Sequence, residues 1–410
     1  MTHNSNNMYD ILQITALKQF RCLGDACEDT CCKNWGMQIG AATIAKYEKY
    51  APELLQAVDV ANDGNIMKRD SCSDFCVKYE AGLCSIHRDY GEDFLGDACN
   101  FFPRATRKMG SHILMSAALS CPEIVRLCVI NEGVISNGAV NNDADNYYDK
   151  VQTANLPESI KDYALSDLSD NDAVAFHQIL VQHVLSPNIT AEQALINITT
   201  TLDALAMQPT ENWAGATPMY LKFAQGRMAK PQANIADAFN LANILAMLAN
   251  LTTNQINPRL TNTINLITQA LNVQFDANAG TLILGNDSAE IWQNASEKWL
   301  AEWQTPLQPV LKKWLATELA LNFFPFSGLG DDFVQRLTIL CVRYATVRLA
   351  IIAHHITHNA MPSDVELVVI IQSLARFLDH LSDAETMLNF CDQAGWNTQN
   401  RLNGLLNMKD

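Results

Sequence analysis

The 410-residue sequence has few basic residues. Its 28 Lys and Arg stand against 44 Asp and Glu, which gives a formal net charge of -16. Surfaces that bind nucleic acid are usually basic, so this balance argues against a nucleic-acid partner. The motifs G-x-G-x-x-G and G-x-x-x-x-G-K-[ST] are also missing, which leaves a dinucleotide-binding fold and a P-loop without support. The acidic surface fits either a lysine-rich protein partner or simple solubility.

The sequence has no long hydrophobic run that is free of charge. Its most apolar stretch, Leu337–Ile356, contains Arg343 and Arg348 near the middle. Charges are costly inside a bilayer, so we expect a buried helix here and not a membrane span. The polar start of the chain does not have the basic and apolar regions of a signal peptide. We therefore expect a cytoplasmic protein with no membrane partner.

Cysteine is nearly missing from most of the chain and is crowded into its first third. Only Cys341 and Cys391 follow Cys128, although the sequence has 12 cysteines. In a reducing cytosol, crowded cysteines more often ligate a metal than form disulfides, and a chain of this length does not need disulfides to fold. Structural disulfides and inert core cysteines are the two other interpretations.

The spacing of the cysteines predicts a sulfur-ligated centre without selecting its metal, since thiolates suit zinc, Cu(I) and iron–sulfur clusters. The two runs are Cys22-x4-Cys27-x3-Cys31-Cys32 and Cys72-x3-Cys76-x7-Cys84-x14-Cys99. Only some pairs have the tight spacing of zinc knuckles. The radical S-adenosylmethionine signature Cys-x3-Cys-x2-Cys is missing because Asn34 takes its last position, and the bacterial ferredoxin spacing is missing too. If residues 27–31 are helical, Cys27 and Cys31 share one face and Cys32 points elsewhere.

The pattern along the chain predicts a mainly α protein. We expect a small cysteine-rich α+β metal-binding domain at residues 1–130, an Asn/Gly/Asp-rich linker at 131–149, and a large helical domain at 150–410 as the candidate for substrate binding. In the first part, Met8–Phe20 and His112–Ser120 have the pattern of strands, and Ala41–Val58 that of a helix with a break near Pro52. Pro122 is placed to begin a helix.

Beyond residue 150, helical periodicity predicts helices at roughly 172–186, 190–207, 232–251, 261–272, 287–303, 308–322, 332–358 and 363–380. One hairpin is expected over Val273–Leu284, around Asn278-Ala279-Gly280. The tryptophans recur at helical spacings that favour core packing over a ligand site, namely Trp292, Trp299, Trp303 and Trp314.

Several short motifs around the cysteines occur in a fixed order. They are Phe20-Arg21-Cys22-Leu23-Gly24, Cys27-Glu28-Asp29-Thr30-Cys31-Cys32, Gly82-Leu83-Cys84-Ser85-Ile86, Gly91-Glu92-Asp93, Cys99-Asn100-Phe101-Phe102-Pro103-Arg104 and Leu119-Ser120-Cys121-Pro122-Glu123. Over about residues 9–130, the chain thereby resembles the flagellin lysine-N-methylase family, which is related to a wider group of zinc- or iron-chelating cysteine-cluster proteins.

The resemblance implies an enzyme that methylates the ε-amino groups of flagellin lysines. Family members are reported to draw the methyl group from S-adenosylmethionine and to carry an iron–sulfur cluster, which we expect to be of the [4Fe–4S] type, with zinc as the alternative metal. Carried over by position, the motif cysteines are Cys22, Cys27, Cys31, Cys32, Cys76, Cys84, Cys99 and Cys121. Cys72 and Cys128 fall outside the pattern. The sequence departs from the family at Cys76-Val77-Lys78-Tyr79, where members commonly have Cys-Pro-Phe-Leu.

The chemistry of the reaction requires a neutral amine, because protonated lysine is not a nucleophile. Carboxylates beside the cysteines could bind the ammonium group or accept its proton, namely Asp25, Glu28, Asp29, Glu92, Asp93 and Asp97. Aromatic residues could line a cation–π slot, namely Tyr79, Tyr90, Phe101 and Phe102. For Arg88 and Arg104 we favour ion pairs with Asp93 or Asp97 over contacts to a cofactor carboxylate. The sequence identifies neither a catalytic base nor the donor pocket.

Two other functions fit the same residues. The main alternative is a non-enzymatic zinc- or iron–sulfur-binding module whose helical domain binds a partner. The other is a redox protein or a carrier of clusters. Eight motif cysteines exceed the four that one [4Fe–4S] centre needs, so some ligate a second metal or only pack around the first.

Overall fold

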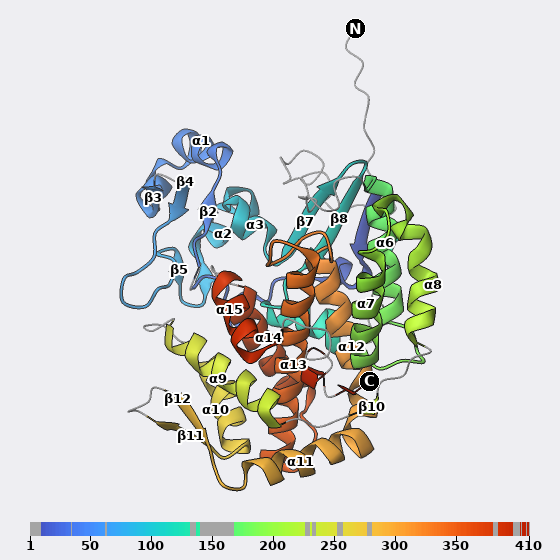
Figure 1. Ribbon diagram of the computed structural model, residues 1–410. Coiled ribbons are helices and arrows are strands. Elements are labelled where there is room, and N and C mark those ends of the chain that lie inside the picture. Colours follow the sequence, from blue (N-terminus) through green and yellow to red (C-terminus); the bar gives the residue numbers. More distant parts are fainter. Residues whose placement is uncertain are drawn as a thin grey trace.

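The computed structural model of the protein describes residues 10–33, 35–61, 64–131, 137–139, 168–225, 230–231, 235–251, 257–276, 281–379, 384–396, 402, 404–406 and 408–409. The prediction of a mainly α protein is confirmed, because helices make up most of these residues (Figure 1). Most of the predicted linker, 131–149, lies outside the described residues. The domain boundaries drawn from the sequence stay a prediction.

A four-stranded sheet contains one strand from the start of the chain and three strands from residues 104–139. Its order is β7-β8-β1-β9, with β1 parallel to β8 and antiparallel to β9. The strands are β1 (Asp10–Ile14), β7 (Arg104–Met109), β8 (His112–Ala117) and β9 (Asn137–Ala139). Where one strand was expected over Met8–Phe20, the chain turns at Thr15 into the 3-10 helix Thr15–Gln19, which buries Ala16 and Leu17. The strand expected over His112–Ser120 is confirmed by β8.

Between β1 and β7 the chain leaves the sheet and forms a small unit at residues 35–101, which we call the head. Its elements are β2 (Gln38–Ile39), α1 (Ala41–Tyr50), the 3-10 helix Pro52–Ala57, β3 (Val58–Ala61), β4 (Gly64–Met67), β5 (Tyr79–Glu80), β6 (Leu83–Cys84), α2 (Ser85–Tyr90), the 3-10 helix Glu92–Phe94 and α3 (Asp97–Phe101). The break expected near Pro52 is confirmed, since α1 ends at Tyr50 and Pro52 begins the next helix. Proline is favoured at that first position because its missing N–H needs no partner there.

The large helical body follows the sheet. Its helices are α6 (Asp170–Val184), α7 (Ala191–Leu205), α8 (Trp213–Gln225), α9 (Ile235–Leu251), α10 (Pro258–Ala270), α11 (Ser288–Lys298), the π-helix Trp299–Trp303, α12 (Gln304–Leu321), α13 (Phe333–His358), α14 (Asp364–Asp379) and α15 (Ala384–Ala394). Every range predicted to be helical contains a helix. The hairpin over Val273–Leu284 is also confirmed, as β11 (Val273–Asp276) pairs antiparallel with β12 (Thr281–Leu284). Helix α8 was missed because Pro218 lies inside it, and proline normally breaks a helix.

The buried residues form two hydrophobic clusters. The larger one joins the sheet to the body, for Ile14 and Leu114 belong to it together with Trp314 and the other predicted core tryptophans. Accordingly, β8 contacts α12, and the short helix α4 (Pro122–Val125) contacts α14. The smaller cluster lies within the head and centres on Met37, Tyr47 and Ile86. The head therefore has its own small core and sits beside the body (Figure 1).

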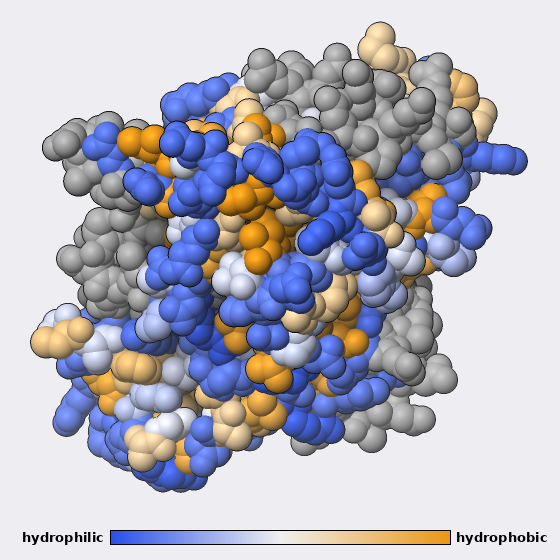
Figure 2. Space-filling view, turned by 90° about the horizontal axis from the view of Figure 1, so that it is seen from below, coloured by the Kyte–Doolittle hydropathy of each residue, from blue (hydrophilic) through white to orange (hydrophobic). Residues whose placement is uncertain are grey.

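Helix α13 runs through the middle of the body (Figure 1). Among the described residues it is the one helix long and apolar enough to cross a membrane, but the whole of its apolar window is buried inside the protein. The expectation of a buried helix is confirmed. On the face seen in Figure 2, hydrophilic side chains predominate and hydrophobic ones form separate patches between them.

Candidate functional site

The eight motif cysteines come from short elements at the contact of the head with the body. Cys22 and Cys27 flank the 3-10 helix Gly24–Ala26, and Cys31-Cys32 follow it. In the head, Cys76 precedes β5, Cys84 ends β6 and precedes α2, and Cys99 lies in α3; Cys121 is the N-cap of α4. Residues 27–31 are not helical, so the expected placement of Cys27 and Cys31 on one helix face is wrong. The 3-10 helix ends at Ala26 because Cys27 takes an extended conformation.

Three of these cysteines lie in the head, and Cys32 packs against its core from outside. The Cys32 carbonyl accepts a hydrogen bond from the Cys76 backbone N–H at 2.9 Å, and Cys76, Cys32, Cys84 and Cys99 all pack in or against the head's hydrophobic cluster. Burial raises the pKa of Cys99, and the thiols of the other three raise it further. Burial likewise raises the pKa of Cys76 to about 11, with Cys32 and Cys84 contributing. We call Cys32, Cys76, Cys84 and Cys99 the head thiols.

We call the other four cysteines the junction thiols, namely Cys22, Cys27, Cys31 and Cys121. Cys22 interacts electrostatically with both Cys31 and Cys121. Burial raises the pKa of Cys121 to about 12; backbone N–H groups of α4 oppose the shift, and Cys27 and Cys22 add to it. Burial also raises the pKa of Cys27. Burial thus holds the thiols of Cys121 and Cys27 protonated until a cation compensates for their charge.

Cys31 and Cys32 connect the two groups. The Cys31 thiol hydrogen-bonds the sulfur of Cys32, which raises the pKa of Cys31 and lowers that of Cys32 to about 7. The Thr30 hydroxyl and the Arg376 guanidinium lower the pKa of Cys32 further, against the effect of burial. Cys32 is therefore the most acidic of the described thiols whose pKa is shifted.

The eight motif cysteines are chemically suited to ligate a metal as thiolates, but their sulfurs do not converge on one position. All 12 cysteines are free thiols, so no disulfide competes for them. Among the residues that the structure describes, no three Cys, His, Asp or Glu side chains converge closely enough to ligate one ion. The side-chain oxygen of Asn100, next to Cys99, is buried without a hydrogen-bond partner. A centre at this place requires the side chains to draw together around it.

The remaining cysteines lie elsewhere. Cys72 is exposed, and its backbone N–H donates to Asp70 at 3.2 Å. Cys128, Cys341 and Cys391 are buried in the large hydrophobic cluster. Cys128, Cys341 and Cys391 are therefore core residues, whereas Cys72 lies at the surface.

Residues 27–33, which we call the junction segment, are held by hydrogen bonds and an ion pair from helix α14 of the body. Arg376 donates to the carbonyl oxygens of Thr30 at 2.9 Å and Lys33 at 2.8 Å, and it forms an ion pair with Asp29 at 2.9 Å. Gln372 donates to Asp29 at 2.7 Å and to the carbonyl of Ser120, beside Cys121, at 3.0 Å. The backbone on either side of Cys31-Cys32 is thereby fixed to the body.

Two more body residues reach the same segment from the start of α10. The Asn257 side-chain amide donates to Asp29 at 3.0 Å, and Arg259 interacts electrostatically with Asp29, Glu28 and Cys27. Glu28 itself forms an ion pair with Arg126, which also pairs with Glu123. The sequence analysis did not identify four of these residues, because no local sequence pattern links them to cysteines that lie far away in the chain. They are Asn257, Arg259, Gln372 and Arg376.

The carboxylates and aromatics singled out by the sequence divide between structural roles. Arg88 forms ion pairs with Asp89 at 2.7 Å and Glu80 at 3.1 Å, so an ion pair is confirmed, although with other partners than expected. Arg104 lies over the ring of Phe20. Tyr90 hydrogen-bonds Glu53.

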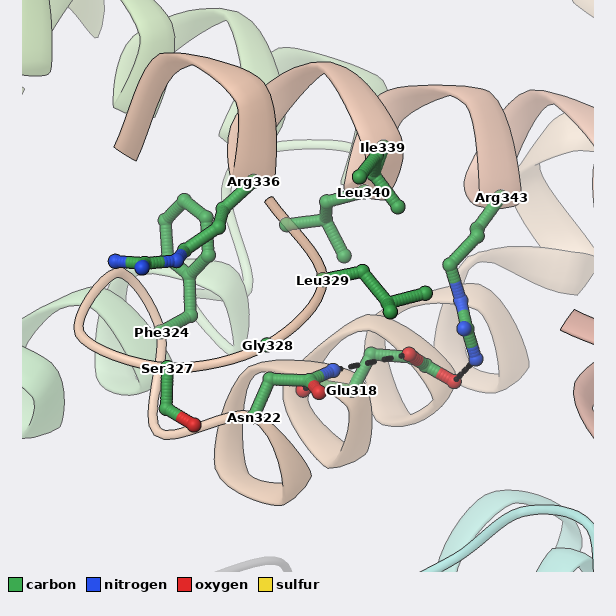
Figure 3. Close-up of a pocket in the computed structure, with 10 residues that line it drawn as sticks. All are labelled: Glu318, Asn322, Phe324, Ser327, Gly328, Leu329, Arg336, Ile339, Leu340 and Arg343. Atoms are coloured by element: carbon green, nitrogen blue, oxygen red, sulfur yellow. Dashed lines mark hydrogen bonds and ion pairs between the residues drawn. The ribbon is translucent and has the colours of Figure 1, made fainter. Parts of the chain in front are cut away.

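The well-formed pocket in Figure 3 lies within the body, between α12 and α13, and not at the thiols. Its volume of about 30 Å³ is room for a water molecule or two, and far below the 300–1,000 Å³ typical of small-molecule sites. Glu318 projects into it from α12 and Arg343 from α13, and the two form an ion pair at 2.9 Å. Arg343 also binds Asp379 at 2.5 Å. This pocket cannot receive S-adenosylmethionine in the conformation described.

Comparison with known proteins assigns the helical part of the chain to a family. A family model described as the FliB lysine N-methylase C-terminal domain matches residues 130–405. Flagellar biosynthetic protein FliU of Salmonella muenchen is 28% identical over 117 residues, which are 26% of this chain and 68% of that protein.

Two proteins named lysine-N-methylase are also similar. The one from Salmonella typhimurium is 26% identical over 116 residues and the one from Salmonella choleraesuis is 26% identical over 115 residues. In both cases the match covers 26% of this chain and only 29% of the other protein. No solved structure is significantly similar to this one.

Proposed function

Because the chain belongs to the FliB lysine N-methylase family, we propose that it is a protein-lysine N-methyltransferase that methylates flagellin with S-adenosylmethionine as the donor. The observation that carries this proposal is the family match over residues 130–405. It is independent of the cysteine motifs, which lie before residue 130 and suggest the same family. The cysteine motifs and the helical body meet at the junction segment, where α14 and α10 contact Asp29 and Thr30.

The reaction transfers a methyl group from a sulfonium to an amine. The lysine nitrogen forms the new N–C bond, the S–CH₃ bond breaks, and its electron pair stays on sulfur as a thioether. Before this step the lysine ammonium must lose a proton, since its pKa is near ~10.4 in water. Placing the amine in a desolvated site lowers that pKa and favours the nucleophilic form. No base is assigned here, because Glu28 and Asp29 are already held by Arg126 and Arg376.

We propose further that the motif cysteines hold an iron–sulfur cluster, with the head thiols as one set of four ligands and the junction thiols as a second set. Two adjacent sets of four sulfurs account for the excess over a single [4Fe–4S] centre. The role of the chain is to supply the thiolates and to hold the Cys31-Cys32 backbone through Arg376.

The alternative function is a non-enzymatic module in which zinc joins the head to the body. It is favoured by the position of the thiols at that contact, where a closed metal site would act as a staple. Zinc has a filled d shell and is colourless. Absorbance near ~400 nm and acid-labile sulfide in anaerobically purified protein therefore identify an iron–sulfur protein.

The decisive experiment measures methylation itself. Flagellin is incubated with the purified holoprotein and S-adenosylmethionine, and its peptides are analysed by mass spectrometry for added methyl groups on lysine. We expect methyl-lysine only when protein and donor are both present. Flagellin that stays unmodified with a metal-loaded protein, and that keeps its methyl-lysines in cells lacking this protein, contradicts the enzyme proposal.

A further inference from the structure

Arg259 stands at the second position of α10, directly after the N-cap Asn257 and Pro258. The start of this helix faces the junction segment, for Asn257 donates to Asp29, and Arg259 interacts with the charges of Asp29, Glu28 and Cys27. The guanidinium group therefore lies close to one of the junction thiols.

Two nitrogens of this guanidinium, Nε and Nη2, are buried and have no hydrogen-bond partner. They are the two nitrogens of one edge of the group, and their N–H bonds point the same way. That edge matches the two oxygens of a carboxylate with a pair of parallel N–H···O bonds. A buried donor pair of this kind without an acceptor is costly, since its hydration is lost and nothing replaces it.

The carboxylates of the chain that lie near Arg259 are held by other groups. Glu28 is bound by Arg126, which also holds Glu123. Asp29 accepts hydrogen bonds from Asn257 and Gln372 and pairs with Arg376. Burial lowers the pKa of Arg259, and the charges of Asp29 and Glu28 only oppose this. The free edge is thus left for a ligand.

We propose that the Nε–Nη2 edge of Arg259 binds the carboxylate of the amino-acid part of the methyl donor, next to the junction thiols. This inference rests on the proposed function for the identity of the donor. It assigns a binding residue from the helical body to a site whose other groups come from the cysteine motifs.

The test compares two probes that differ in the carboxylate. S-Adenosylhomocysteine carries the amino-acid group of the donor without its reactive methyl, and 5′-methylthioadenosine lacks that group. Binding of each to metal-loaded protein is measured by isothermal titration calorimetry. For Arg259→Gln we expect about 10- to 100-fold weaker binding of S-adenosylhomocysteine, the loss typical of hydrogen bonds to a charged group. Affinity for 5′-methylthioadenosine is expected to stay the same.

Two further variants complete the comparison. Arg259→Lys keeps the charge but not the paired donors, so we expect an intermediate loss for S-adenosylhomocysteine. Arg88→Gln is the control, because Arg88 is exposed and bound to Asp89 and Glu80 in the head, and it is expected to bind both probes like the unaltered protein. Thermal melting and metal content are measured for each variant.

Each outcome has a definite meaning. Equal binding of S-adenosylhomocysteine by Arg259→Gln and the unaltered protein overturns the inference and leaves the proposed function standing. A loss of metal from Arg259→Gln and Arg259→Lys, with equal weakening for both probes, also overturns it, since Arg259 then serves the thiolates. Absence of S-adenosylhomocysteine binding by the unaltered metal-loaded protein overturns the proposed donor, and the inference with it.

Discussion

Cys31 and Cys32 are neighbours in the chain and both interact electrostatically with Cys99, but they differ in their other partners. Cys31 interacts with Cys22 and with Cys99, whereas Cys32 lies with the head thiols. Their mutual hydrogen bond joins the two groups and leaves Cys32 with a pKa of about 7. The residue types alone indicated thiolate chemistry, but the grouping of the thiols follows from the turn of the chain after Ala26, which no spacing rule describes.

The first prediction concerns single thiols. Replacing one ligand of a metal centre leaves an incomplete set, so Cys99→Ser and Cys121→Ser are each expected to lose one of two centres and about half of the bound metal. Cys72→Ser is the control, because Cys72 is exposed and lies outside both groups. Iron, zinc and sulfide per chain are measured in anaerobically purified protein. Full metal content in Cys99→Ser and Cys121→Ser, or equal losses in all three variants, contradicts the assignment.

Three helices of the body meet at one buried group of charges. Arg343 of α13 binds Glu318 of α12 and Asp379 of α14. Two carboxylates on one guanidinium leave one negative charge uncompensated, and burial together with Asp379 raises the pKa of Glu318 to about 7. The helices themselves were predictable from periodicity. The ion pairs between these helices were not predictable. From the sequence, Arg343 indicated only that its helix does not span a membrane.

The second prediction is that the free energy of unfolding depends on pH through Glu318 of α12. The pKa of Glu318 is raised from 4.5 to about 7, so the folded protein keeps a proton that the unfolded chain loses at lower pH. The stabilisation from Glu318 is complete below pH 4.5 and is lost as the pH rises toward 7. Glu318→Gln stays neutral and should not show this loss. Urea unfolding from pH 4.5 to 8 measures the difference between the two proteins.

A matched variant sharpens this measurement. Asp379→Asn removes the like charge beside Glu318 and should lower the pKa of Glu318, which reduces the loss of stability with pH. His177 titrates in the opposite sense, because burial lowers its pKa to about 4, and it contributes equally to all three proteins. Parallel stability profiles for the unaltered protein and Glu318→Gln would rule out the raised pKa.

At the scale of the molecule, the head has its own core and is fastened to the body through the junction segment. The fastening residues on the body side, Gln372 and Arg376, lie on one face of α14, since they are four positions apart along the helix. Arg376 meets both a buried carboxylate and two backbone carbonyl groups. Its loss would leave all three without that partner.

The third prediction is that Arg376→Ala releases the head. Removing one member of a largely buried ion pair typically costs about 3 kcal/mol or more, and we expect that loss in the free energy of unfolding from urea titration. Hydrogen exchange should become faster in residues 35–101 and stay slow in α13. Arg88→Ala, at an exposed ion pair of the head, is the control and should change neither. Uniform acceleration throughout the body would show that Arg376 supports the whole fold and not this contact.

The sequence by itself indicated most helices of the body, the break at Pro52, the start of α4 and the crowding of thiols in the first third of the chain. These features depend on residues within a few positions of each other, through periodicity, proline geometry and the chemistry of thiolates. Only the tertiary structure decided which thiols are neighbours, and that Arg259, Gln372 and Arg376 meet them. The contact of Gln372 with Asp29 spans 343 residues. It depends on how the head and the body pack, and such packing leaves no pattern in the sequence near either residue.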